Sequence, residues 1–183
     1  MKPNPRIHVT GAACAGVTTL GQRLSDLLAL PLIDTDDYYW VATDPPYTTR
    51  RPIDERNRLI RAQMGAGGWI LSGSVDGWGD RLVEDADLVV FLTAPTAVRL
   101  ARLIAREHRR FGARIRPGGD MEKIHASFLD WASRYDDAGF TGRSRARHEL
   151  WLSEQRAPVL RLGAQRPVDD LAKDVLARLA EIG

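Results

Sequence analysis

Short apolar runs rich in β-branched residues recur along the chain, and helix-compatible sequence separates each run from the next. The runs lie at Arg6–Thr10, Pro31–Ile33, Trp69–Ser72, Asp87–Leu92 and Pro158–Leu162. This alternation is typical of repeated βα units, so it predicts an α/β fold in which helices cover a five-stranded parallel sheet. The fourth run, from Leu88 to Leu92, is apolar at every position, which predicts an inner strand covered on both faces.

The stretch between the fourth and fifth runs, about 65 residues, is longer than a single crossover helix needs. Thr96–Arg110 has a helical pattern with an apolar face of Leu100, Ala101 and Ile104. A second face carries arginines spaced near one helical turn, at Arg99, Arg102, Arg106 and Arg109. After a basic stretch with glycines, a second helix aligns Met121, Ile124, Phe128 and Tyr135. We therefore expect a small lid carried on two helices, over about 106–135.

The length of 183 residues suits one domain with a substantial core, so we expect a single domain over 1–183. The stretch Pro167–Ile182 predicts a closing helix that packs on the sheet. No run is long and apolar enough to span a membrane, and the segment Met1–Pro5 has no apolar signal core. We therefore expect a cytoplasmic protein.

Charge and cysteine content exclude several classes of protein. The 26 basic residues against 24 acidic ones give a net charge of +2, so a nucleic-acid partner is not expected. Cys14 stands alone and cannot form an internal disulfide, and the 4 scattered histidines lack the spacing of a zinc site. All but three of the basic residues are arginine, which favours phosphate recognition or reflects a GC-rich coding bias.

A phosphate-binding loop follows the first predicted strand directly. The segment Gly11–Leu20 reads GxxxxG-x-T between a strand and a helix, where small residues let backbone N–H groups surround a phosphate. The residues predicted to bind ATP here are Gly11, Ala13, Cys14, Ala15, Gly16, Val17, Thr18 and Thr19. The Thr18 hydroxyl is a candidate ligand of Mg²⁺. The alternative is a glycine-rich turn from strand to helix that binds nothing.

The lysine expected in such a loop is absent, because Val17 occupies its position. Losing one preorganised charge at a developing anion commonly costs on the order of 3 kcal/mol. Either arginines compensate, with Arg106 and Arg134 as the first candidates, or transfer is slow or absent. Cys14 beside a helix N-terminus is a candidate for a lowered thiol pKa, or is simply a small loop residue.

Carboxylates end the second predicted strand, at the sheet edge where open α/β folds bind ligands. Asp34 would hold Mg²⁺, and Asp36 would accept a proton from the hydroxyl of an acceptor. We place the acceptor-binding region at about 34–68, where Tyr38, Tyr39, Trp40, Tyr47 and, further along, Trp78 are candidates to wall a pocket for a flat ring. The alternative is an acidic loop that caps the next helix.

Four blocks of the sequence together resemble the adenylate-kinase-like P-loop kinases, most closely the branch labelled DNA topology modulation protein or adenylate-kinase-related ATPase. The blocks are Gly11–Thr19, Ile33–Trp40, Leu71–Asp80 and Arg134–Asp137. The resemblance covers nearly the whole chain. It implies a three-layer P-loop NTPase fold with a parallel sheet in the order 2-3-1-4-5.

The resemblance also implies roles for residues beyond the loop. Arg102 would lie against the nucleotide base, and Arg106 would reach the phosphates. Arg134 would bridge the donor and acceptor phosphates, with Arg145 as its partner. Gln165 lies in a segment similar to the loop whose backbone contacts adenine.

The chain departs from this family at two places, and both concern function. Val17 replaces the lysine, and the Gly-x-Pro-Arg segment that holds AMP in adenylate kinases has no counterpart. We therefore expect a Mg·ATP-dependent kinase whose small acceptor is a nucleotide or is nucleoside-like. The alternatives are a nucleotide-binding module or slow ATPase that acts through a partner, and DNA binding through the arginines of 109–116 and 143–147.

Overall fold

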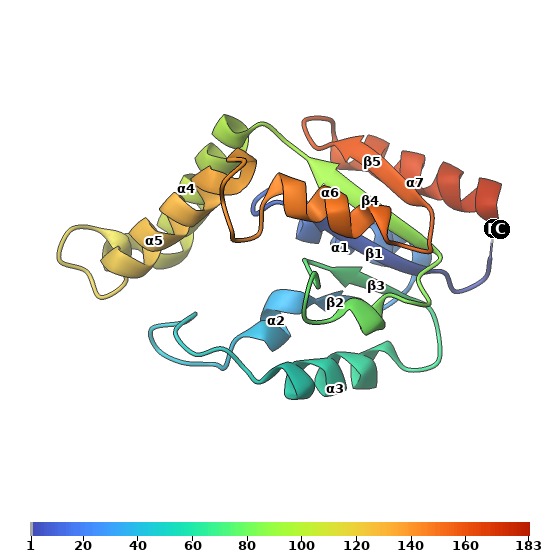
Figure 1. Ribbon diagram of the computed structural model, residues 1–183, viewed down its shortest axis with the longest axis horizontal. Helices are drawn as coiled ribbons and strands as arrows, with labels where there is room; N and C mark the ends of the chain where they lie inside the picture. Colours follow the sequence, from blue (N-terminus) through green and yellow to red (C-terminus); the bar gives the residue numbers. More distant parts are fainter. Residues whose placement is uncertain (1) are drawn as a thin grey trace.

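Five strands form one parallel sheet in the computed structural model, which describes residues 2–183 (Figure 1). The strands are β1 (Arg6–Gly11), β2 (Leu32–Asp34), β3 (Trp69–Ser72), β4 (Leu88–Thr93) and β5 (Val159–Gly163), and their order is β2-β3-β1-β4-β5. The five-stranded parallel sheet and its strand order are therefore confirmed. β4 is an inner strand, and five of its six residues are buried, as its unbroken apolar run predicts.

The strand register brings the carboxyl ends of the first three strands to one edge. Asp34 at the end of β2 is level with Ser72 at the end of β3, and Ser72 is level with Val9 in β1. Gly11 ends β1 two residues further along. The loop after β1 and the carboxylate that ends β2 thus lie side by side.

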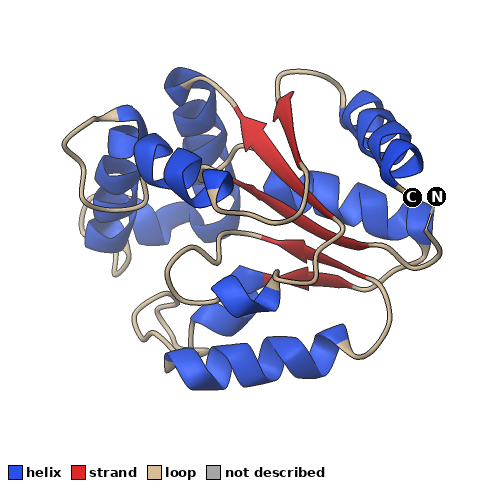
Figure 2. Ribbon diagram, turned by 45° about the vertical axis from the view of Figure 1, so that its right-hand side comes forward, coloured by secondary structure: helices blue, strands red, loops and turns tan. Residues whose placement is uncertain are grey.

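Helices cover both faces of the sheet, and each face has its own hydrophobic core (Figure 2). α1 (Val17–Leu28) and α7 (Val168–Ile182) pack on one face, and α3 (Ile53–Met64) and α6 (Arg145–Ser153) on the other. Successive residues of β4 alternate between the two cores, with Val90 in one core and Val89 in the other. The predicted closing helix is confirmed.

α4 (Thr96–Phe111) and α5 (Glu122–Ser133) lie side by side and project from the sheet at the left of Figure 1. The 3₁₀ turn η2 (Gly112–Ile115) joins them. Both helices lie where the pattern predicts them.

The predicted apolar face of α4 is wrong. Ile104 is 41% exposed, and the buried line of the helix is Arg99, Leu103 and Glu107, one helical turn apart. The reason is that polar groups of η3, α5 and the neighbouring loops meet this side of α4, so its buried charges have partners.

Further short elements lie between the predicted ones. α2 (Thr35–Tyr39) is capped by the Asp34 side chain, which accepts a hydrogen bond from the Asp36 N–H at 3.0 Å, so the helix cap of the alternative for this acidic segment is present. The 3₁₀ turns η1 (Asp80–Leu82) and η3 (Arg134–Asp136) follow β3 and α5. α6 is capped by Ser144, and this helix was not predicted. No helix between residues 2 and 183 has the length and apolar character needed to cross a membrane.

Candidate functional site

The loop between β1 and α1 has the backbone conformation of an anion cradle. Cys14 and Gly16 both have positive φ, at 59° and 103°, so the chain turns tightly before α1 begins at Val17. At Gly11, a side-chain carbon would lie 2.5 Å from the Leu92 carbonyl oxygen. Only glycine permits this approach of the loop to β4, so the first glycine of the motif is required by packing as well as by chemistry.

Thr18 and Asp34 meet directly at the start of α1. The Thr18 hydroxyl donates to Asp34 Oδ2 at 2.8 Å, and both side chains are accessible to solvent. Oxygen donors are what Mg²⁺ prefers, and it usually takes one or two from protein while substrate phosphates and water supply the rest. These two oxygens fit that ion. The structure therefore brings together the two predicted metal ligands.

Val17 turns its side chain toward the interior and packs against the hydrophobic core beneath the loop. The position of the missing lysine therefore brings no charge to the phosphate cradle.

A cation comes from α4 instead. Arg102 donates from Nη1 to the Ala15 carbonyl at 3.4 Å and from Nη2 to the Ala164 carbonyl at 2.9 Å. It ties the phosphate loop to the segment after β5, where Gln165 is exposed.

Asp36 and Asp37 stand on α2, directly after the predicted metal ligand Asp34. Burial, and second the charge of Asp34, raise the pKa of both carboxyls. Arg143 and Arg106 oppose the rise at Asp36, and Arg110 opposes it at Asp37. A carboxylate with a raised pKa is better matched to proton transfer near neutral pH. The role of Asp36 as a proton acceptor stays a prediction, and the direction of its pKa shift is compatible with it.

The Cys14 thiol has a raised pKa, because burial outweighs the nearby charges of Arg106, Arg99 and Arg102. Burial favours the neutral thiol over the reactive thiolate. The lowered pKa considered for this cysteine is therefore wrong. The small-residue interpretation accounts for its place in the loop.

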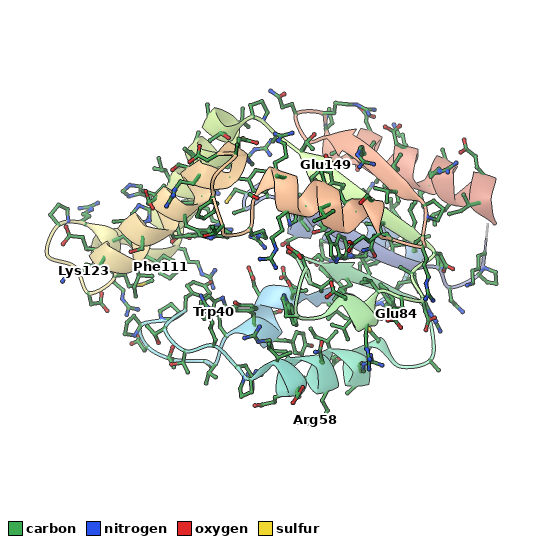
Figure 3. The ribbon with its side chains drawn as sticks, viewed as in Figure 1. Trp40, Arg58, Glu84, Phe111, Lys123 and Glu149 are labelled. Carbon is green, nitrogen blue, oxygen red and sulfur yellow. The ribbon has the colours of Figure 1, made fainter. Side chains whose placement is uncertain are left out.

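An aromatic wall runs from α2 to the tip of the α4–α5 hairpin. Tyr39 meets Trp40, Trp40 meets Tyr47, and Tyr47 meets Phe111, each edge to face, with ring centroids 5.0, 5.8 and 6.4 Å apart. Figure 3 labels Trp40 and Phe111, the two residues whose rings contact Tyr47. Tyr39, Trp40 and Tyr47 thus form a continuous row of rings, and Phe111 joins it from α4. The pocket for a flat ring stays a prediction.

The segment 40–52 is held to the α4–α5 hairpin by an ion pair. Asp44 accepts from Arg114 Nη2 at 2.5 Å, and Arg114 also pairs with Asp120 at 2.6 Å. Arg110 lies over the Tyr47 ring at 5.4 Å. The segment 40–52 and the α4–α5 hairpin therefore touch across the open edge of the site.

Two arginines lie beside this wall: Arg56, which the sequence analysis missed, and Arg143, which it considered only for DNA binding. Arg56 on α3 is 5% exposed; its guanidinium lies 3.8 Å over Tyr39, and its Nε donates to a backbone carbonyl. Arg143 has a buried Nε with no hydrogen-bond partner, and the charges of Asp36 and then Tyr135 and Tyr39 act on it. Neither guanidinium forms an ion pair within residues 2–183. The helical spacing of Arg56 with the apolar Ile60 and Met64 could have indicated that Arg56 is buried. Nothing in the sequence distinguishes Arg143 from Arg145.

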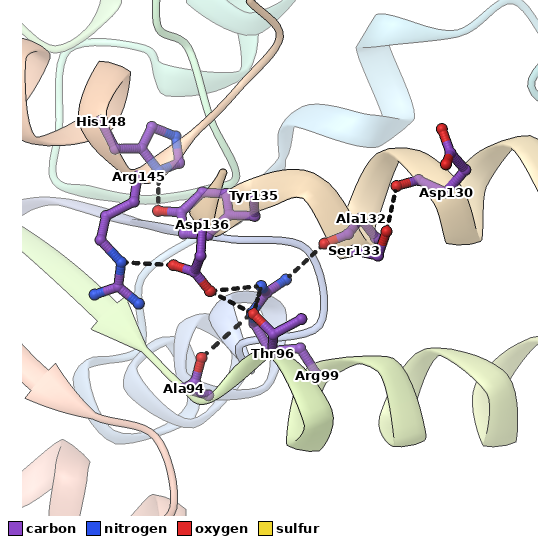
Figure 4. A network of polar contacts seen from close by, with 10 residues as sticks. All are labelled: Ala94, Thr96, Arg99, Asp130, Ala132, Ser133, Tyr135, Asp136, Arg145 and His148. Atoms are coloured by element: carbon purple, nitrogen blue, oxygen red, sulfur yellow. Dashed lines mark hydrogen bonds and ion pairs between the residues drawn. The ribbon is translucent and has the colours of Figure 1, made fainter. Parts of the chain in front are cut away.

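The two other predicted arginines are engaged elsewhere. Arg145 donates from Nε to Asp136 Oδ1 at 2.6 Å, inside the network drawn in Figure 4. Arg134 lies 3.7 Å from Asp137 and over the Phe140 ring. Their roles in transfer stay predictions.

A second buried chain of hydrogen bonds links this network to the end of β3. The Tyr135 hydroxyl is 2.8 Å from His148 Nδ1, and His148 Nε2 is 3.3 Å from the Ser74 hydroxyl. Burial lowers the pKa of His148 to about 3, so the ring is neutral. At Gly73 a side-chain carbon would collide with Thr35, which explains the glycine between the two serines after β3.

Comparison with known proteins places the fold. No family model matches the chain. It is 42% identical over 181 residues to "Uncharacterized protein YqaC" of Bacillus subtilis (strain 168), covering 98% of this chain and 99% of that protein. Among solved structures it is similar to a shikimate kinase from Acinetobacter baumannii, with a TM-score of 0.58, 16% identity and coverage of 97% of this chain and 93% of that one. A gluconokinase from Sinorhizobium meliloti 1021 gives 0.54 and 16%, with coverage of 100% and 95%. The chain therefore has the fold of P-loop kinases.

Proposed function

We propose, from the premise that this chain belongs to the protein family of Bacillus subtilis YqaC and has a P-loop kinase fold, that it is a Mg·ATP-dependent kinase for a small acceptor. The observation that carries the proposal is the contact between the Thr18 hydroxyl and Asp34 at 2.8 Å. It joins the phosphate loop to the acceptor side of the sheet edge. Asp34 also caps α2 through its other oxygen, so the proposal depends on the accessible Thr18–Asp34 pair and not on Asp34 alone.

Each part of the site has a chemical task in this proposal. The backbone N–H groups of Gly11–Thr19 bind the phosphates, and Thr18 and Asp34 hold Mg²⁺, which neutralises charge on the phosphate oxygens when bound. Arg106 stabilises the charge of the transferred group. The bond between the γ-phosphorus and the bridging oxygen breaks, and a bond to the acceptor oxygen forms. Asp36 accepts the proton that the hydroxyl loses.

The acceptor carries a hydroxyl and an anionic group in this proposal. A buried guanidinium is costly unless an anion pairs with it. Arg56 and Arg143 lack a carboxylate partner within the described residues, and both lie near Tyr39. A carboxylate or phosphate of the acceptor would supply the missing charge, and the aromatic wall would hold a flat ring of a nucleotide or nucleoside-like acceptor.

The α4–α5 hairpin acts as a lid in this proposal. Closure over the phosphates excludes water and completes the cationic side of the site. The Asp44–Arg114 ion pair supports this role, because it joins the hairpin to the acceptor loop.

Phosphorus NMR of the protein with Mg·ATP and pooled acceptors tests the proposal. The pool combines nucleoside monophosphates, neutral nucleosides, sugar phosphates and small hydroxy acids. We expect a new phosphorylated product from an anionic acceptor. Thr18→Ala should abolish it and Thr18→Ser should retain it, which separates the protein's own activity from a contaminating kinase. Full activity of Thr18→Ala would contradict the mechanism.

A second function is favoured by one observation, the apolar packing of Val17. A loop without its own cation suits a nucleotide-binding module or slow ATPase that signals through a partner. The same experiment distinguishes it: free phosphate alone, or ATP binding without any product, would favour this second function.

A further inference from the structure

α4 buries a carboxylate in the half of the helix that faces the site. Glu107 is 4% exposed, in line with Arg99 and Leu103. A buried carboxylate costs several kcal/mol unless it is paired, on the order of the penalty for any buried ion. The proposed mechanism gives Glu107 no task, so its burial calls for an explanation.

Two nitrogen-bearing side chains approach this carboxylate. Arg106 Nη2 donates to Oε1 at 3.3 Å, and His125 Nδ1 lies 3.8 Å from Oε2 without a hydrogen bond. Arginine keeps its charge at every pH that proteins meet, whereas a histidine is charged only in part near neutrality. Arg106 is therefore the permanent partner of Glu107.

Arg106 lies one helical turn beyond Arg102 on α4, and Arg102 donates to the loop carbonyl of Ala15, so the two arginines share the side of the helix that meets the phosphate loop. The field of Arg106 lowers the pKa of Cys14 in the loop and of Asp36 on α2, although burial dominates both shifts. Its guanidinium lies 5.9 Å from the centre of the Phe128 ring on α5. The proposed function needs a cation beside this same loop, because Val17 brings none.

We propose that Glu107 is a positioning residue, which holds the Arg106 guanidinium toward the phosphate loop and so makes it a fixed replacement for the missing lysine. The inference rests on the proposed function for the role of Arg106. A guanidinium has five N–H donors. Glu107 occupies one on Nη2, and the others stay available for phosphate oxygens. Holding the side chain beforehand reduces the rotamer entropy lost when the nucleotide binds.

A double-mutant cycle between Glu107→Gln and Arg106→Ala tests this. The quantity measured is the Kd for Mg·ATP by calorimetry, because it can be read whether or not an acceptor is phosphorylated. We expect Arg106→Ala to weaken binding about tenfold and Glu107→Gln about fivefold. In the Arg106→Ala background, Glu107→Gln should change the Kd less than about twofold, since its partner is gone.

The matched control is Glu149→Gln, which breaks a surface ion pair with Arg161 of 2.7 Å on the far side of α6. It should leave the Kd unchanged. If Glu107→Gln changes the Kd equally in both backgrounds, the inference is overturned and Glu107 has a purely structural role. An unchanged Kd in Arg106→Ala would overturn it as well. Absence of transfer with the expected coupling in Kd would contradict only the kinase activity.

Discussion

Arg99 at the start of α4 and Arg143 just before α6 differ in their partners. Arg99 is almost wholly buried and donates to the carbonyls of Ala94 and Ala132 and to Thr96, beside Asp136 (Figure 4). Arg143, by contrast, has a buried Nε without a hydrogen-bond partner.

The difference separates charges that hold the fold together from charges available to a ligand. A buried charge must be compensated, by the protein or by what binds. Where the protein supplies every partner, as for Arg99, the arginine links chain segments. Where it supplies no carboxylate within 4 Å, as for Arg56 and Arg143 among the described residues, we propose that an anion of the ligand does so. An arginine count alone cannot make this distinction.

The largest expected effect comes from removing the guanidinium of Arg99. Arg99→Met removes the hydrogen bonds that join the end of β4, the end of α5 and η3, and leaves buried carbonyls unpaired. We expect the free energy of unfolding to fall by about 3 kcal/mol, measured by urea denaturation. Arg109→Met, on the exposed side of the same helix, should change it by less than about 0.5 kcal/mol. Equal losses in the two variants would remove the basis of the comparison.

The second effect concerns function and contrasts two arginines that are two residues apart. Arg143→Met should raise the KM for an anionic acceptor about a hundredfold, because it removes the guanidinium proposed to pair with the acceptor's anion. The free energy of unfolding should fall less than in Arg145→Met, because no ion pair is lost and only the contact with the Trp131 ring at 4.9 Å changes. Arg145→Met breaks the ion pair with Asp136 and should mainly lower stability. Steady-state kinetics and urea denaturation of both variants check this. A larger loss of activity in Arg145→Met would support the role implied by the resemblance.

The fold followed from the sequence because its causes are local. Runs of apolar β-branched residues mark strands such as Trp69–Ser72, whose predicted and observed bounds coincide. The face of α4 was predicted wrongly for the opposite reason. The partners of Arg99 and Glu107 lie on η3 and α5, so no pattern within the helix reveals that these charges are buried.

The site was predictable only where one short motif holds it. The loop before α1 supplies Thr18, and the end of β2 supplies Asp34, and parallel strands bring such ends together. The surroundings of Arg56 and Arg143 are formed by side chains from segments far apart in the sequence. Whether a carboxylate lies within reach of each guanidinium is therefore known only from the folded structure.

The third prediction concerns His148, which contacts Tyr135, the ring covered by Arg99, and on which the charge of Arg143 also acts. Burial lowers its pKa from 6.5 to about 3, and lowers that of His8 to about 4. The unfolded chain therefore binds protons that the folded protein does not, so stability is full above pH 6.5 and is lost as the pH falls toward these values.

Between about pH 6 and pH 5, each histidine should cost up to about 1.4 kcal/mol of unfolding free energy. His148→Asn removes one of these two contributions, so its pH dependence should be shallower by about that amount. Urea denaturation at several pH values measures the slope. A variant with the slope of the parent protein would mean that His148 is not held neutral.

The smallest expected effect is on the loop itself. Val17→Lys adds the charge that P-loop kinases carry there, but Arg106 already supplies a cation in our proposal. The turnover number should therefore rise less than about tenfold, and the lost packing of Val17 on the core should cost about 1 kcal/mol of stability. Val17→Met, which keeps the position apolar, is the matched control for the packing change. A gain of about a hundredfold would show that the natural loop lacks its cation, and would favour the binding module over the kinase.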